Sequence, residues 1–138
     1  ALLFVTVLPA AADSYREKQP VCGAEAARNV EQLLGNISSW KEFSSLYADY
    51  SFCDQSALRY AFVQRIAELT AADEGLKGLS EAVRANAKLR AAVIRHLQSE
   101  SVPADLARRI REKANTDCPT GEQRICRAVS KAVEDTKN

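Results

Sequence analysis

The sequence has few of the residues on which enzymes and metal sites depend. It contains one histidine, His96, and its four cysteines are not arranged as the paired C-x-x-C knuckles of a zinc site. Catalysis by a Ser/His or Cys/His set would have to use His96, which we expect to be an ordinary surface or half-buried residue of a helix. The sequence therefore predicts a protein that is not an enzyme and that holds neither a metal ion nor a cofactor.

Glycine is also scarce, and the five glycines do not form a phosphate-binding loop. Gly75 and Gly78 stand in the sequence Gly-Leu-Lys-Gly, which is not followed by the Gly-Lys-Ser/Thr of a nucleotide-binding loop. The apolar run from Leu2 to Leu8 is too short to span a bilayer. We therefore expect no nucleotide site and no membrane span in the mature chain.

The N-terminal stretch predicts export. The run from Leu2 to Leu8 is followed by Pro9 and three alanines, which matches the apolar core and cleavage site of a secretory signal peptide. No methionine and no basic leader precede this run, so we expect the sequence to begin inside the signal. Residues 1–12 are then a truncated signal peptide, and residues 13–138 a single helical domain in the bacterial periplasm or outside the cell. The alternative is a buried N-terminal helix or strand.

The cysteines agree with export. They are even in number and allow three disulfide pairings among Cys22, Cys53, Cys118 and Cys126. We favour Cys22–Cys53 with Cys118–Cys126, because each bridge would close a local corner between helices. The alternative is four reduced, buried thiols in a cytosolic protein.

Hydrophobic spacing predicts an all-α fold. No run alternates apolar and polar residues for long enough to form a strand, whereas apolar residues recur every three or four positions. Residues 39–72 should form two amphipathic helices, joined by a corner at Cys53, that carry most of the aromatic side chains. Ser39 and Glu42 have the spacing of a capping box at the start of the first helix. We expect a single-domain bundle of five to seven short helices, stapled by two disulfides.

Two boundaries are less sharply marked. Asp54 or Ser56 is expected to cap the second aromatic helix, because both side chains can accept a hydrogen bond from a free backbone amide. Residues 75–98 can be read as one helix or as two, with Asn86 as a kink or as a new cap.

The charges nearly cancel over the whole chain but are unevenly spread. There are 19 basic and 18 acidic residues, whereas residues 84–113 hold eight basic residues against three acidic ones. This excess indicates either the solvated faces of two helices or a surface for an acidic partner. Nucleic acid is disfavoured by export and by the isoelectric point of 7.9. The residues predicted to contact a partner are Arg84, Lys88, Arg95, Arg108, Arg109, Arg111 and Tyr60.

One ordered pattern resembles a known group of proteins. The order W-x-x-F-x-x-L-Y-x-x-Y-x-x-C-D, followed by AFVQRIAEL, AAVIRHLQ and a later Cys-Pro, resembles short, all-helical exported bacterial proteins of uncharacterised function. The resemblance covers residues 40–118 and rests on packing residues, so it implies a helical fold and assigns no catalytic residue. In size, compartment and helix content the chain is also similar, as a class, to periplasmic immunity proteins such as the helical amidase inhibitors of type VI secretion.

Together these patterns predict an exported helical module that binds another protein, as an inhibitor or an immunity factor. The alternative function is a carrier of a small apolar ligand, held in a pocket between the aromatic helices. An enzyme would need a cleft with convergent polar groups, which the sequence does not reveal.

Overall fold

The computed structural model describes residues 20–135, which form helices and no strand. The seven α-helices are α2 (Ala24–Asn36), α3 (Trp40–Tyr50), α4 (Ser56–Ala71), α5 (Gly75–Val83), α6 (Ala87–Leu97), α7 (Ala104–Thr116) and α8 (Gln123–Asp135). A short 3-10 helix, η1 (Ser51–Cys53), lies between α3 and α4. The predicted all-α class and the number of helices are confirmed. The predicted signal peptide, residues 1–12, lies outside the described residues.

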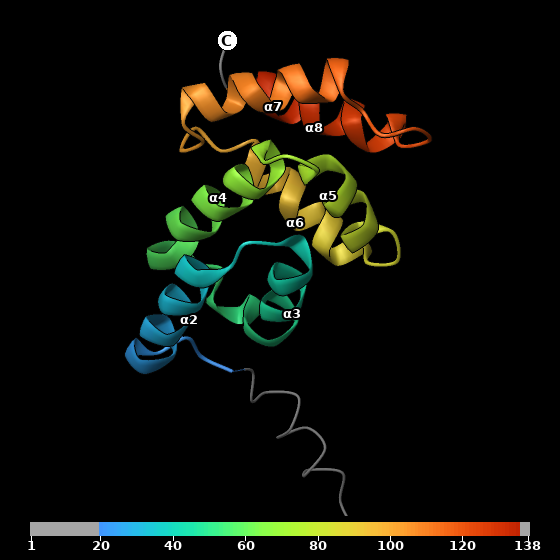
Figure 1. Cartoon of the computed structure of the whole chain (residues 1–138). Helices are drawn as coiled ribbons and strands as arrows, with labels where there is room; N and C mark the ends of the chain where they lie inside the picture. Colours follow the sequence, from blue (N-terminus) through green and yellow to red (C-terminus); the bar gives the residue numbers. More distant parts are fainter. Residues whose placement is uncertain (1–19, 136–138) are drawn as a thin grey trace, which may run out of the picture.

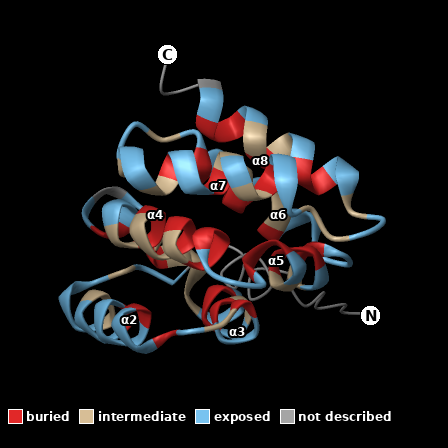
Figure 2. Cartoon of the chain, turned by 45° about the horizontal axis from the view of Figure 1, so that its top comes forward, coloured by how far each residue is buried: buried red, intermediate tan, exposed pale blue. Residues whose placement is uncertain are grey.

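The helices are arranged in three tiers (Figure 1). α2 and α3 form one end, α4, α5 and α6 form the middle, and the hairpin of α7 and α8 forms the other end. α7 packs on α4 and α8 packs on α6, so the hairpin covers the middle tier. The buried residues face inward between the tiers, while the outer faces of the helices are exposed (Figure 2). The buried side chains form one continuous hydrophobic cluster.

Aromatic side chains of α3 and α4 lie at the centre of this cluster. Phe43 stacks on Tyr47 with the ring centroids 5.8 Å apart, and Phe62 meets these two rings edge-on at 6.2 and 5.9 Å. Phe43 and Phe62 are fully buried. Aromatic pairs of this kind contribute about 0.5 to 1.5 kcal/mol each beyond the burial of their surface. The aromatic stripe of the sequence is therefore core, as expected from its spacing.

The structure settles the helix boundaries in the first half of the chain. The Glu42 amide donates a hydrogen bond to Ser39 Oγ at 3.1 Å, so the predicted cap of α3 is present. Residues 75–98 form two helices rather than one. The side chain of Asn86 caps the second of them, α6, by accepting a hydrogen bond from the Leu89 amide at 3.0 Å.

Two disulfides fasten the bundle. Cys22–Cys53 joins the segment before α2 to η1, and Cys118–Cys126 joins the loop after α7 to the first turn of α8. These are the pairings favoured from the sequence, and all four cysteines are used. Disulfides of this kind are typical of proteins in oxidising compartments. Within residues 20–135, no helix combines the length and the apolar character needed to cross a membrane.

Candidate functional site

A buried polar network lies between the end of α6 and the corner that follows η1. The Asp54 carboxylate accepts hydrogen bonds from His96 Nε2 and from the Tyr47 hydroxyl, each at 2.8 Å. The Arg95 guanidinium lies 3.7 Å from the same carboxylate. The side chains of Asp54 and His96 are each only 3% exposed. One carboxylate therefore joins α3, α6 and the corner before α4 inside the protein.

Both ring nitrogens of His96 face hydrogen-bond acceptors. Nδ1 lies 2.6 Å from the carbonyl oxygen of Ala92, one helical turn earlier, and Nε2 lies 2.8 Å from Asp54. A carbonyl oxygen and an ionised carboxylate can only accept, so a ring that satisfies both carries a proton on each nitrogen. The geometry therefore corresponds to an imidazolium–carboxylate pair. In this arrangement both ring nitrogens of His96 are engaged inside the protein.

The pKa values of the two acidic partners shift in opposite directions. Burial by itself would raise the pKa of Asp54, but the hydrogen bonds and charge of His96, followed by the hydrogen bond from Tyr47 and the charge of Arg95, outweigh burial and lower it. Burial, together with the hydrogen bond and the negative charge of Asp54, raises the pKa of Tyr47 to about 12. At neutral pH the network therefore consists of an ionised aspartate and a neutral tyrosine.

Two expectations from the sequence are wrong at this site. His96 is neither at the surface nor half-buried, since it is 4% exposed. Asp54 does not cap α4: the capping position is Gln55, and the Asp54 side chain is turned toward α6. A signal for the burial of His96 was available, because it stands seven residues after Leu89 and three after Val93, on the buried stripe of α6.

A surface hollow of about 250 Å³ lies over this network. It is bordered by α4 and the C-terminal end of α6, and we call it the α4/α6 hollow. The residues that line it are Arg59, Val63, Arg95, His96, Gln98 and Ser99. Arg59 is exposed and the side chain of Arg95 is 63% exposed. The guanidinium groups of Arg59 and Arg95 therefore border a hollow that is also lined by His96, a member of the buried network.

The seven residues predicted to bind a partner lie on several elements. They are Tyr60 on α4, Arg84 and Lys88 around the turn between α5 and α6, Arg95 on α6, and Arg108, Arg109 and Arg111 on α7. One of them, Arg95, lines the α4/α6 hollow; Tyr60, which is 60% exposed, follows Arg59 in α4 but is not among the lining residues. Arg59 itself is missing from the predicted set, although it stands beside Tyr60 in the sequence. The three arginines of α7 lie on a different tier of the bundle (Figure 1).

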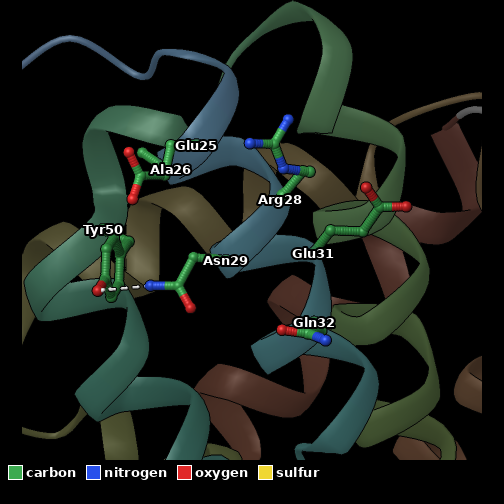
Figure 3. Close-up of a pocket in the computed structure, with 7 residues that line it drawn as sticks. All are labelled: Glu25, Ala26, Arg28, Asn29, Glu31, Gln32 and Tyr50. Carbon is green, nitrogen blue, oxygen red and sulfur yellow. Dashed lines mark hydrogen bonds between the residues drawn. The ribbon is translucent and has the colours of Figure 1, made fainter.

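A larger hollow, of about 890 Å³, lies along α2 (Figure 3). The residues that line it are Glu25, Ala26, Arg28, Asn29, Glu31, Gln32 and Tyr50. Its charged side chains, from Glu25, Arg28 and Glu31, spread apart along one helix. Asn29 donates a hydrogen bond to the Tyr50 hydroxyl at 3.1 Å. Within residues 20–135, neither this hollow nor any other place brings together three His, Cys, Asp or Glu side chains as ligands for a metal ion.

Fold and site together define a class of protein: a small all-helical domain, fastened by two disulfides, with a buried ion pair beneath an arginine-rimmed surface hollow. No protein-family model, no curated protein and no solved structure matches the chain.

Proposed function

We propose that the protein is an exported module that binds another protein through the α4/α6 hollow. The observation that carries this proposal is the placement of Arg59 and Arg95 at the rim of a hollow that is also lined by the buried His96, with the exposed Tyr60 next to Arg59 in α4. Arginine and tyrosine are enriched among the residues that supply most of the binding energy at protein interfaces. Because the buried network holds the floor in place, little ordering is needed on binding, which favours affinity.

The charge of the hollow indicates the chemistry of the partner. The lining residues include Arg59 and Arg95 and no acidic residue, and the buried Asp54 beneath them is already paired with His96. A guanidinium group matches the two oxygens of a carboxylate, so these arginines favour a partner that presents an Asp or Glu side chain to the hollow.

Export and the lack of catalysis belong to the same proposal. The two disulfides and the apolar stretch at residues 2–8 support the periplasm or the extracellular space as the working compartment. The engagement of both nitrogens of the one histidine supports a protein that is not an enzyme. An inhibitor or an immunity factor is the form of protein-binding module that these properties fit.

The proposal is tested by co-purification from the exported fraction of the native host. The test variant is R59A/R95A, and the matched control is R108A/R109A, which removes the same charge from α7. A partner should be recovered in a 1:1 ratio with the wild-type protein and with the control, and be lost with R59A/R95A. Equal recovery with both variants, or no stoichiometric partner of the wild-type protein, would contradict the proposal.

An apolar groove supports a second candidate function, the carriage of a small apolar ligand. The groove, of about 450 Å³, lies between α2 and α3, with Leu33, Ile37, Leu46 and Tyr50 among its lining residues. The pocket was expected between the aromatic helices, but the rings of α3 and α4 pack against one another there. A ligand would instead lie in the groove between α2 and α3. Saturable binding of a fluorescent fatty acid that is lost in Leu33→Glu would favour the carrier, and unsaturable binding would exclude it.

A further inference from the structure

A small hollow lies where the end of α5 meets the first turns of α6 and α8. It has a volume of about 160 Å³, and we call it the α5/α8 hollow. The residues that line it are Ser80, Val83, Arg84, Arg90, Glu122, Arg124 and Ile125. Three arginines from three separate elements and one glutamate give it two net positive charges.

Ser80, one of the residues that line this hollow, has a buried hydroxyl without a hydrogen-bond partner among the described residues. The residue is only 4% exposed. Buried hydroxyls in native proteins are almost always paired, and a serine inside a helix commonly bonds to the carbonyl one turn earlier. Guanidinium groups are donors only, so the species that would satisfy both Ser80 and the arginines is an acceptor.

Two of the three arginines of this hollow stand where the helices disfavour them. Arg90 and Arg124 lie near the starts of α6 and α8, the positive ends of the helix dipoles, and neither helix has an acidic residue in its first turn. Glu122 pairs with Arg84 at 3.1 Å, whereas Arg90 and Arg124 make no ion pair with any residue from 20 to 135. A local conflict of this kind is typical of functional sites. A bound anion removes the conflict.

We propose that the α5/α8 hollow binds a tetrahedral oxyanion, a phosphate or sulfate group, with Arg84, Arg90, Arg124 and Ser80 as donors. The donors come from three elements and therefore approach from different directions. Four oxygens of a phosphate or sulfate can meet them, whereas a planar carboxylate offers two. The volume is well below the roughly 300 to 1,000 Å³ of sites for drug-sized ligands, so the hollow takes the oxyanion group alone. This site does not depend on the proposed partner protein.

Calorimetric titration of the full, oxidised domain tests the proposal at constant ionic strength set with chloride. The probes are inorganic phosphate, sulfate, acetate and glycerol 3-phosphate. We expect one saturable site for phosphate or sulfate and weaker binding of acetate. Equal affinity for phosphate and glycerol 3-phosphate would assign the site to the free oxyanion, and a preference for the ester would assign it to an organic phosphate; either result supports an oxyanion site.

Variants separate the site from general charge effects. Arg124→Gln should weaken phosphate binding about tenfold or more, because it removes a charge-assisted hydrogen bond. The matched control, Arg28→Gln, loses the same charge at an exposed position of α2 and should bind phosphate as the wild-type protein does. Ser80→Ala should keep the fold, since it deletes an unpaired hydroxyl, and should weaken binding several-fold. No saturation with phosphate or sulfate, tighter binding of acetate, or equal affinities of Arg124→Gln and Arg28→Gln would overturn the proposal. Unchanged binding by Ser80→Ala would remove Ser80 from it.

Discussion

Replacing Asp54 by asparagine removes one negative charge from the buried network and leaves the shape of the side chain almost unchanged. In the wild-type protein this carboxylate is 3% exposed and accepts hydrogen bonds from His96 and Tyr47. After the substitution, a protonated His96 would be buried without a counter-ion. The ring must then give up the proton on Nε2 or the corner before α4 must open. Either response destabilises the folded state.

The structure sets the expected size of this effect. Removing one partner of a buried ion pair typically costs about 3 to 5 kcal/mol. The amide of asparagine can still accept one hydrogen bond, so we expect the lower end, about 3 kcal/mol at pH 7. For a domain of this length that loss corresponds to a decrease in Tm of about 10 °C.

The pH dependence gives the sharper test. Because the pKa of Asp54 is lowered in the folded protein, its stabilisation is present above the unfolded-state value of about 3.9 and is lost as the pH falls through the folded value. The free energies of unfolding of wild type and Asp54→Asn should therefore differ at pH 7 and converge in acid. Urea titrations followed by circular dichroism measure both.

The control for this experiment is Asp49→Asn, which makes the same chemical change on the exposed side of α3. It should leave the free energy of unfolding within about 0.5 kcal/mol of the wild-type value. A loss below about 1 kcal/mol for Asp54→Asn at pH 7, or a difference that does not change between pH 7 and acid, would refute a charged pair between Asp54 and His96.

Two further predictions concern the other end of the pH scale and the disulfides. Tyr47→Phe should reduce the loss of folding free energy that the wild-type protein shows at alkaline pH. The pKa of Tyr47 is raised to about 12 in the folded state, so its contribution is full below the unfolded value of about 10 and is lost as the pH rises through the folded value. Identical unfolding curves of both proteins between pH 9 and 12 would contradict this. Replacing Cys22 and Cys53 by serine should lower the free energy of unfolding by about 4 kcal/mol, and replacing Cys118 and Cys126 by about 2.5 kcal/mol. The difference arises because the first bridge spans 31 residues and the second 8. Thermal unfolding that ranks the two variants in the reverse order would contradict this prediction.

Much of the fold could be predicted from local patterns. The spacing of apolar residues identified the helices, and Ser39 with Glu42 marked the start of α3. The cysteine pairing followed from an even count and from the preference for bridges that close local corners. Each of these features depends on residues that are near one another in the sequence or that share one helical face.

The polar sites could not be predicted in this way, because their members come from distant segments. Asp54 and His96 are 42 residues apart, and their contact depends on how α6 packs beside the corner before α4. Likewise, Ser80 and Arg124 lie on α5 and α8, and their approach at one hollow depends on the packing of the whole bundle. The position of a charged residue along the chain does not show which other charged residues will lie near it in the folded bundle.

Cys53 of the Cys22–Cys53 bridge immediately precedes Asp54, so the bridge fastens the corner that carries this carboxylate. While the two thiols are reduced, no covalent bond fixes η1, and the corner that carries Asp54 is held by noncovalent contacts alone. We expect the arginine-rimmed surface above it to take its final form only once the sulfurs have been oxidised. On the proposed function, a newly synthesised, reduced chain would then bind its partner only after this disulfide has formed in an oxidising compartment.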